Sequence, residues 1–293
     1  MQKLRINAMK KILLAIIALA VCIGASAQGQ IKTKRFLIKD FREKVTKIVI
    51  PGTGPVYSAL SQEVVDRWTI SAFEFCTPGE FDKLKSSEDY YFLIFTEGSN
   101  SKGISSGVTS LTLVKGGPEA SKGVSAMTKV VSMPICSATA SGGRELTLMG
   151  AFVEIIQAYT LKAIESEKDA YSGLAIFNRL NMNRDGYSKQ MLFSEDDMDP
   201  RFTEAKRSKY MGVFLKVEPE ADVDEAYTSG SYGTLVSYVV APAKVSGDSY
   251  AYKMLIESGT GKLYYFNKEK IRSGQPYGFN EKDLKRIKSL SKR

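Results

Sequence analysis

Glu195-Asp196-Asp197-Met198-Asp199 holds the densest group of acidic side chains in the sequence. Carboxylate oxygens gathered this closely are ligands that calcium accepts. The spacing of an EF-hand is absent, however, because the segment has neither the central glycine nor a glutamate at the twelfth position. The pattern therefore favours a solvated turn ahead of a helix. Glu195, Asp196 and Asp197 are candidate ligand-binding residues, and no metal site is predicted.

Gly52-Thr53-Gly54 is the second candidate segment, between an apolar run at 47–50 and a helical pattern at 56–69. Backbone N–H groups at the start of such a helix attract anions. The third glycine of the dinucleotide fingerprint is missing, and no Gly-Lys-Ser/Thr of a P-loop is present. A tight turn with Pro55 at the start of the helix explains the same residues. Gly52, Thr53 and Gly54 stay candidates for binding, without a nucleotide or any other cofactor being predicted.

Several catalytic chemistries are excluded by composition. The 293 residues contain no histidine, which removes Ser-His-Asp and Cys-His catalysis and zinc sites with histidine ligands. The serines lack a G-x-S-x-G elbow and an S-x-x-K beside a plausible helix start. No spacing of glutamates predicts the fixed pair of carboxyl groups that a glycosidase needs. We therefore predict no catalytic residues.

The amino terminus has the pattern of a Sec signal peptide over residues 1–27. Lys10 and Lys11 precede an apolar run from Ile12 to Ile23, and Ala25-Ser26-Ala27 forms a cleavage site. The run is too short to span the bilayer as a helix, so we expect a protein exported to the periplasm or the extracellular space that is not transmembrane. Four of the 41 basic residues lie in 1–27, so 37 basic residues face 32 acidic ones in the rest. This excess is too small to predict a nucleic-acid partner.

Cys76 and Cys136 are the cysteines left after cleavage of the predicted signal peptide. They could pair in an oxidising compartment. Each also lies in an apolar, strand-like run where a buried free thiol is equally at home. Both alternatives remain open from the sequence.

The periodicity of apolar residues predicts the same unit twice. In the first half, strands are expected at 47–50, 72–76, 90–95, 108–114 and 129–136, and helices at 56–69, from Pro78 onward and at 146–164. Thr77 and Glu80 form a capping box for the second of these helices. In the second half, strands are expected at 190–193, 213–217, 235–240, 250–257 and 263–266, with a helix at 202–211 and a short one after Pro219.

The order strand–helix–strand–helix–strand–strand, found twice, predicts an α/β fold of the α+β sandwich type, with two tandem units that an internal duplication would explain. We expect a first lobe at 28–166, a connector at 167–189, and a second lobe at 190–293. The second lobe ends in a basic amphipathic helix whose apolar side holds Leu284, Ile287 and Leu290. We expect this helix to rest on its own sheet; docking on an anionic surface is the alternative.

Three segments carry a resemblance to a known group of proteins. Residues 68–81, the ending Ala25-Ser26-Ala27-Gln28 and residues 259–265 resemble uncharacterised exported envelope proteins of Bacteroidetes. The element order of the first half is also similar to the amino-terminal α/β domain of TolB, an envelope scaffold. The resemblance implies an envelope location and an α/β fold, and it brings no catalytic residues.

These features favour an exported binding protein of the bacterial envelope whose polar groups are scattered rather than gathered in one centre. Its partner would be an envelope protein or a glycan, and its surface an exposed apolar patch or a free sheet edge. The first surface to consider is a groove between the lobes near 51–56 and 195–201. A small-ligand binding protein with a pocket between the lobes and a hydrolase that works without histidine remain the alternatives.

Overall fold

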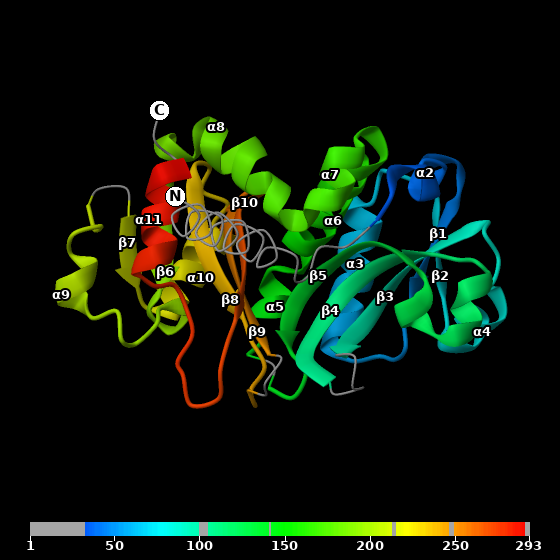
Figure 1. The fold of residues 1–293 in the computed structure, drawn as a ribbon, viewed down its shortest axis with the longest axis horizontal. Helices are drawn as coiled ribbons and strands as arrows, with labels where there is room; N and C mark the ends of the chain where they lie inside the picture. The colour runs from blue at the N-terminus through cyan, green and yellow to red at the C-terminus, as the bar shows by residue number, and fades with distance from the viewer. Residues whose placement is uncertain (1–32, 100–104, 141, 213–214, 246–248, 291–293) are drawn as a thin grey trace, which may run out of the picture. The chain divides into compact units, whose positions relative to one another are not determined.

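Two five-stranded sheets carry the fold (Figure 1). The computed structural model describes residues 33–99, 105–140, 142–212, 215–245 and 249–290. The predicted signal peptide at 1–27 lies outside the described residues. Residues 31–293 form one compact unit, so the halves that the sequence predicts are parts of a continuous structure.

The first sheet has the strand order β2-β1-β3-β4-β5. Strand β1 pairs in parallel with β2 and β3, whereas β4 pairs antiparallel with β3 and with β5. The strands are β1 (Val45–Val49), β2 (Phe73–Cys76), β3 (Tyr90–Ser99), β4 (Ser105–Lys115) and β5 (Thr128–Ser137).

The second sheet repeats this arrangement in the order β7-β6-β8-β9-β10. Here β6 pairs in parallel with β7 and β8, and β9 pairs antiparallel with β8 and β10. The strands are β6 (Gln190–Ser194), β7 (Leu215–Glu218), β8 (Thr234–Val240), β9 (Tyr250–Glu257) and β10 (Leu263–Lys270). The predicted α/β fold with two tandem similar units is therefore confirmed.

Helices connect the parallel strands, because a chain must cross over to return in parallel. The first unit uses α3 (Pro55–Arg67) and α4 (Pro78–Leu84), and the second uses α9 (Glu204–Arg207) and α10 (Glu220–Thr228). Thr77 and Glu80 form the predicted capping box at the start of α4. The helix predicted at 202–211 is limited to α9, which buries no residue and has no side-chain cap and so lacks the packing that stabilises longer helices.

One apolar core joins both sheets to α6 (Met149–Glu165). This helix is predominantly apolar, and eleven of its residues are buried. The core contains Ile48 and Leu111 from the first sheet and Val236 and Met254 from the second. The ring of Phe152 in α6 lies 5.7 Å from that of Tyr238 in β8. The burial of α6 therefore stabilises both units at once.

Residues 167–189, predicted as a polar connector, are largely helical. They form α7 (Glu167–Ser172), a π-helical turn at Asn178–Met182 and α8 (Asn183–Asp185), between short 3₁₀ turns. Buried side chains, among them Leu174 and Phe177, join the core. The segment is part of the packed structure and not a solvated linker.

The carboxyl-terminal helix α11 (Glu281–Leu290) rests on its own sheet, as the sequence predicts. Leu284 and Ile287 are buried in the second apolar cluster. Asp283 in the first turn is also buried, and its carboxylate accepts a 2.6 Å hydrogen bond from Lys253 in β9. The short α2 (Arg35–Ile38) and α5 (Arg144–Thr147) complete the helices used below. Over the described ranges, no helix combines the length and apolar character required to cross a bilayer.

Candidate functional site

The Gly52-Thr53-Gly54 loop forms a turn into α3 rather than a phosphate cradle. Gly54 is the residue before the helix, with φ of −68° and ψ of 159°, and Pro55 takes the first helical position. Neither glycine has a positive φ, and the ring of Tyr57 lies beside both. Gly52 and Thr53 face solvent. No hydrogen bond or ion pair among the described residues joins this loop to Glu195, Asp196 or Asp197.

The acidic cluster at 195–199 is divided by the fold. Glu195 and Asp196 are exposed, whereas Asp197 and Asp199 are buried. Asp199 pairs with Arg201 at 2.7 Å, and Asp197 points into the protein. In the described part of the chain, no group of three metal-ligating side chains is close enough to hold a metal ion. The expectation of a fully solvated turn is therefore wrong for two of the four acidic residues.

Asp197 has a complete set of hydrogen-bond donors. Its carboxylate accepts from the Ser237 hydroxyl at 2.5 Å, from the Val239 backbone N–H at 3.0 Å and from Arg144 Nη1 at 3.3 Å. Burial raises the pKa of Asp197, against the lowering effect of Arg144 and Ser237. The folded protein therefore encloses an acid that depends on these donors to remain ionised.

Arg144 connects the two units. It lies in α5, directly after the first sheet, and its side chain is 9% exposed. Besides Asp197, the guanidinium donates to Asp224 at 2.9 Å and to the Ser237 carbonyl at 3.1 Å, and Glu220 lies 3.5 Å away. All its acceptors belong to β8, α10 or the turn after β6. We call Arg144, Asp197, Glu220 and Asp224 the junction cluster.

The junction cluster corrects the expectation that polar groups are scattered. Each of the three acids pairs with Arg144, and the Ser237 hydroxyl donates to the Asp197 carboxylate rather than facing open space. The arrangement can hold the two units together. Sequence reasoning identified Asp197 but missed Arg144, because no motif surrounds it and its partners are 53 to 93 positions away.

The two cysteines are free thiols at opposite edges of the first sheet. Cys76 lies in β2 and Cys136 in β5, so four strand spacings, roughly 19 Å, separate them. A disulfide needs Cα atoms within about 7 Å, so the alternative of a pair does not fit this fold. Burial raises the pKa of Cys76, and it raises the pKa of Cys136 to about 11. Neither thiol is thus activated as a nucleophile.

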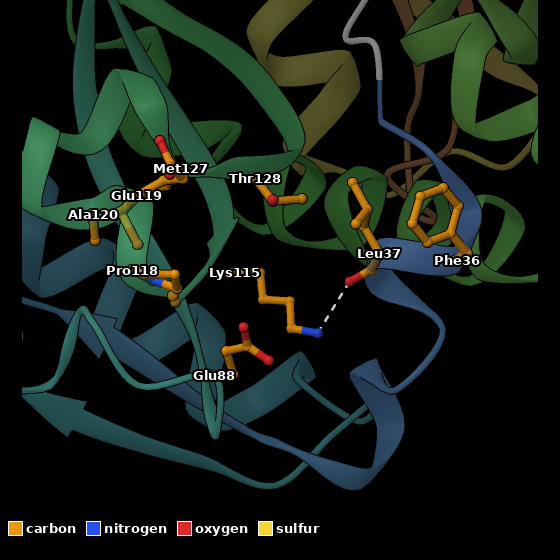
Figure 2. A pocket seen from close by; sticks show the side chains of 11 residues that line it. Phe36, Leu37, Glu88, Lys115, Pro118, Glu119, Ala120, Met127 and Thr128 are labelled. Atoms are coloured by element: carbon orange, nitrogen blue, oxygen red, sulfur yellow. Dashed lines mark hydrogen bonds between the residues drawn. The ribbon is translucent and has the colours of Figure 1, made fainter.

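A pocket of about 360 Å³ lies wholly within the first unit and not between the halves (Figure 2). Phe36 and Leu37 border it, with Glu88 and Lys115 among the polar lining residues. Lys115 donates to the Leu37 carbonyl at 3.1 Å and to Asp40 at 2.7 Å. This cation is already paired, so the pocket offers an incoming ligand few free polar groups.

The outer edge of β2 is an accessible interaction feature of the first sheet. The backbone carbonyls of Ala72 and Cys76 accept hydrogen bonds from the backbone N–H groups of Thr46 and Ile50. These two carbonyls therefore point toward β1. Because backbone groups alternate in direction along a strand, the N–H and C=O groups of Phe73 and Phe75 point away from the sheet. The Phe75 side chain is 43% exposed, a large value for an aromatic ring.

The other sheet edges are covered over part of their length. Asn178 donates to the Phe266 carbonyl at 2.9 Å and accepts from its N–H at 2.7 Å, as a neighbouring strand would along β10. Strand β7 is the counterpart of β2 in the second sheet. The backbone N–H of Gly212, ahead of β7, donates to the Leu215 carbonyl at 3.1 Å, and Val217 packs against the second apolar cluster. The Tyr238 hydroxyl donates to the Ile135 carbonyl in β5 at 2.5 Å. The sequence predicted β2 as a strand without indicating that it lies at an edge.

Comparison with protein-family models, with curated proteins and with solved structures finds no match to this chain.

Proposed function

We propose that this chain is an exported protein of the bacterial envelope that binds a partner protein by accepting an extended segment at the free edge of β2. The observation that carries the proposal is this edge, beside which no further strand of the described residues pairs, with its outward N–H and C=O groups and the exposed ring of Phe75. Export rests on the signal-peptide pattern at 1–27. The internal pairing of the junction cluster supports binding over hydrolysis.

The side chains beside β2 offer an apolar contact. Phe73 and Phe75 lie on the same face as Thr46 and Ile48 of β1, which is the face that α3 and α6 cover. Val65 in α3 is 58% exposed. Glu63 in the same helix approaches Gly150 of α6. Helical periodicity places Val65 on the other side of α3, away from Glu63. A strand added beside β2 would extend the sheet and cover Phe75.

The opposite face of β2 favours a basic partner. Glu74 is exposed on this face and pairs with Lys47, leaving one carboxylate oxygen without an ionic partner in the described residues. A second copy of the chain is a poorer partner. If two copies paired antiparallel through their β2 edges, the outward groups of Phe73 in one copy would bond to those of Phe75 in the other. The two Glu74 side chains would then stand opposite each other, and like charges in that position repel. We therefore expect a segment of another protein that alternates apolar residues with Lys or Arg.

The experiment uses a proline to close the edge. Phe75→Pro removes an N–H that points outward, so the bonds between β1 and β2 remain. A photo-crosslinking amino acid placed at Val65 in the producing bacterium reports the contact. We expect one dominant crosslinked protein, which is lost with Phe75→Pro and reduced with Phe75→Ala. Synthetic peptides covering the crosslinked segment should then bind the purified wild-type chain and not Phe75→Pro.

Two results would reject this proposal. The crosslink could persist unchanged with Phe75→Pro while circular dichroism shows an intact fold, which would place the contact elsewhere. The crosslinked product could also be a dimer of the chain itself, which would make the edge a self-association surface.

A further inference from the structure

A row of exposed cations lies on the outer side of α11. Leu284 and Ile287 are buried in the second apolar cluster, which fixes the side of the helix that meets the protein. Helical periodicity places Lys282, Lys285 and Arg286 on the opposite side, and all three are exposed. The helix has ten residues and is therefore about 15 Å long. The cations are thus spread along the helix and not gathered around one point.

The segment after α9 brings a further cation to this side of the second unit. The Tyr210 hydroxyl donates to the Glu281 carboxylate, at the start of α11, at 3.0 Å. Phe202, ahead of α9, belongs to the same apolar cluster as Leu284, and its ring lies 6.0 Å from that of Tyr210. These contacts hold the segment against the beginning of α11, and the exposed Lys209 directly precedes Tyr210. We call the following four residues the basic surface: Lys209, Lys282, Lys285 and Arg286.

The acids nearby do not neutralise the basic surface. Lys285 pairs with Glu281 at 3.0 Å, but the lysine side chain is still 65% exposed. Within the described ranges, Lys209 and Lys282 have no acidic partner. Asp283, the other acid of α11, is buried. Positive charge therefore remains in excess on this side of the helix.

Charge is also the main means by which this region can hold a partner. Among the described residues, no large apolar side chain is exposed on α9, on the turn after it or on α11. Glu204 is an exposed acid of α9, and Lys206 and Arg207 of the same helix outweigh it. Lysine is a compact point charge, unlike the planar fork of arginine. Lysines spread along a helix therefore match many anionic groups distributed over a surface better than one small anion.

We infer that the basic surface binds the anionic headgroups of a phospholipid bilayer, with α11 lying along the membrane. Several Lys and Arg residues on an amphipathic helix are attracted to anionic lipids in this way. The apolar side of α11 stays on its own sheet, so the chain lies on the bilayer without entering the hydrocarbon. Binding is then reversible and depends on salt. The inference involves no residue of the β2 edge and does not rest on the partner proposed there.

Membrane binding is tested by flotation of the full mature chain, from Gln28 onward, with lipid vesicles. The vesicles consist of phosphatidylcholine alone or of an equal mixture of phosphatidylcholine and phosphatidylglycerol. Removal of the predicted signal peptide ensures that its apolar run does not itself bind the lipid.

Two triple variants with the same net charge separate the basic surface from general attraction. The test variant combines Lys209→Gln, Lys282→Gln and Lys285→Gln. The control variant removes three exposed lysines from other parts of the chain by combining Lys83→Gln, Lys168→Gln and Lys262→Gln. The single variant Lys282→Gln supplies the same test if circular dichroism shows that the triple variant does not fold.

We expect the wild type to float with the mixed vesicles at about 0.1 M salt and not with phosphatidylcholine alone. It should be released at about 1 M salt, because the Debye length falls from about 10 Å to about 3 Å. Lys282→Gln should bind about fivefold more weakly than the wild type, and the test variant about 100-fold more weakly. The control variant should stay close to the wild type, because its lysines lie outside the basic surface.

The inference is overturned if the wild type does not float with the mixed vesicles at about 0.1 M salt. Flotation that persists at about 1 M salt would also overturn it, because an apolar contact would then hold the chain. An equal loss in the control and test variants would show attraction by net charge alone. Retention on alginate beads without binding to vesicles would make an anionic polysaccharide the partner instead. A failure of the crosslinking experiment at β2 leaves all these outcomes unchanged, so the two proposals can fail separately.

Discussion

Replacing Arg144 with Met should destabilise the protein strongly through Asp197. The substitution removes the ionic partner of three acids whose side chains differ in exposure: 6% for Asp197, 29% for Asp224 and 40% for Glu220. The two more exposed acids can regain water, but Asp197 cannot. A buried charge that loses its partner typically costs about 3–5 kcal/mol, and we expect this loss in the free energy of unfolding at neutral pH.

The loss of stability in Arg144→Met should depend on pH in a definite direction. The folded state already raises the pKa of Asp197, and loss of Arg144 should raise it further. A carboxyl group whose folded pKa lies above its unfolded pKa destabilises the fold when ionised, and this penalty disappears as the pH falls below the folded pKa. The deficit of Arg144→Met should therefore be smaller at about pH 5 than at about pH 7.

Urea-induced unfolding of the wild type, Arg144→Met, Asp197→Asn and the double variant measures these effects. The double variant should lose less than the sum of the single losses, because neutral Asn no longer needs the guanidinium. Lys122→Met is the control: Lys122 and Glu119 form an exposed pair, which contributes little to stability. A small loss for Arg144→Met that is equal at both pH values would refute the view that Asp197 is buried and charged.

Three further outcomes follow from the packing. Lys253→Met should release α11 by leaving Asp283 without its buried cation, and faster amide hydrogen exchange limited to that helix would show it; unchanged exchange would contradict the assignment. Gly116→Ala should destabilise by about 1–3 kcal/mol, because the new methyl group would lie 2.1 Å from the Ser87 carbonyl oxygen. Gly142→Ala, with open space around it, should change stability little in the same urea titration. Both thiols of the first sheet should react with a thiol reagent in denaturant without prior reduction, and slowly in the native protein; a missing thiol in denaturant would indicate a disulfide after all.

The elements of the fold could be predicted from the sequence because their causes are local. The capping box of Thr77 and Glu80 involves residues three positions apart, and the repeated pattern of strands and helices is an alternation of side chains along each segment. The order of elements predicted an α/β fold with two tandem similar units, and the two sheets of matching strand order confirm it. The helix at 202–211 was overestimated because its extent depends on packing, which periodicity cannot measure.

The tertiary structure alone decided which charged groups matter. Asp197 and Glu195 are similar in sequence terms, yet one is enclosed and the other faces solvent. The partner of Asp197 is 53 residues away, a separation at which no spacing rule applies. Coulombic interactions and desolvation depend on distance and burial in space, and the linear order of residues carries neither.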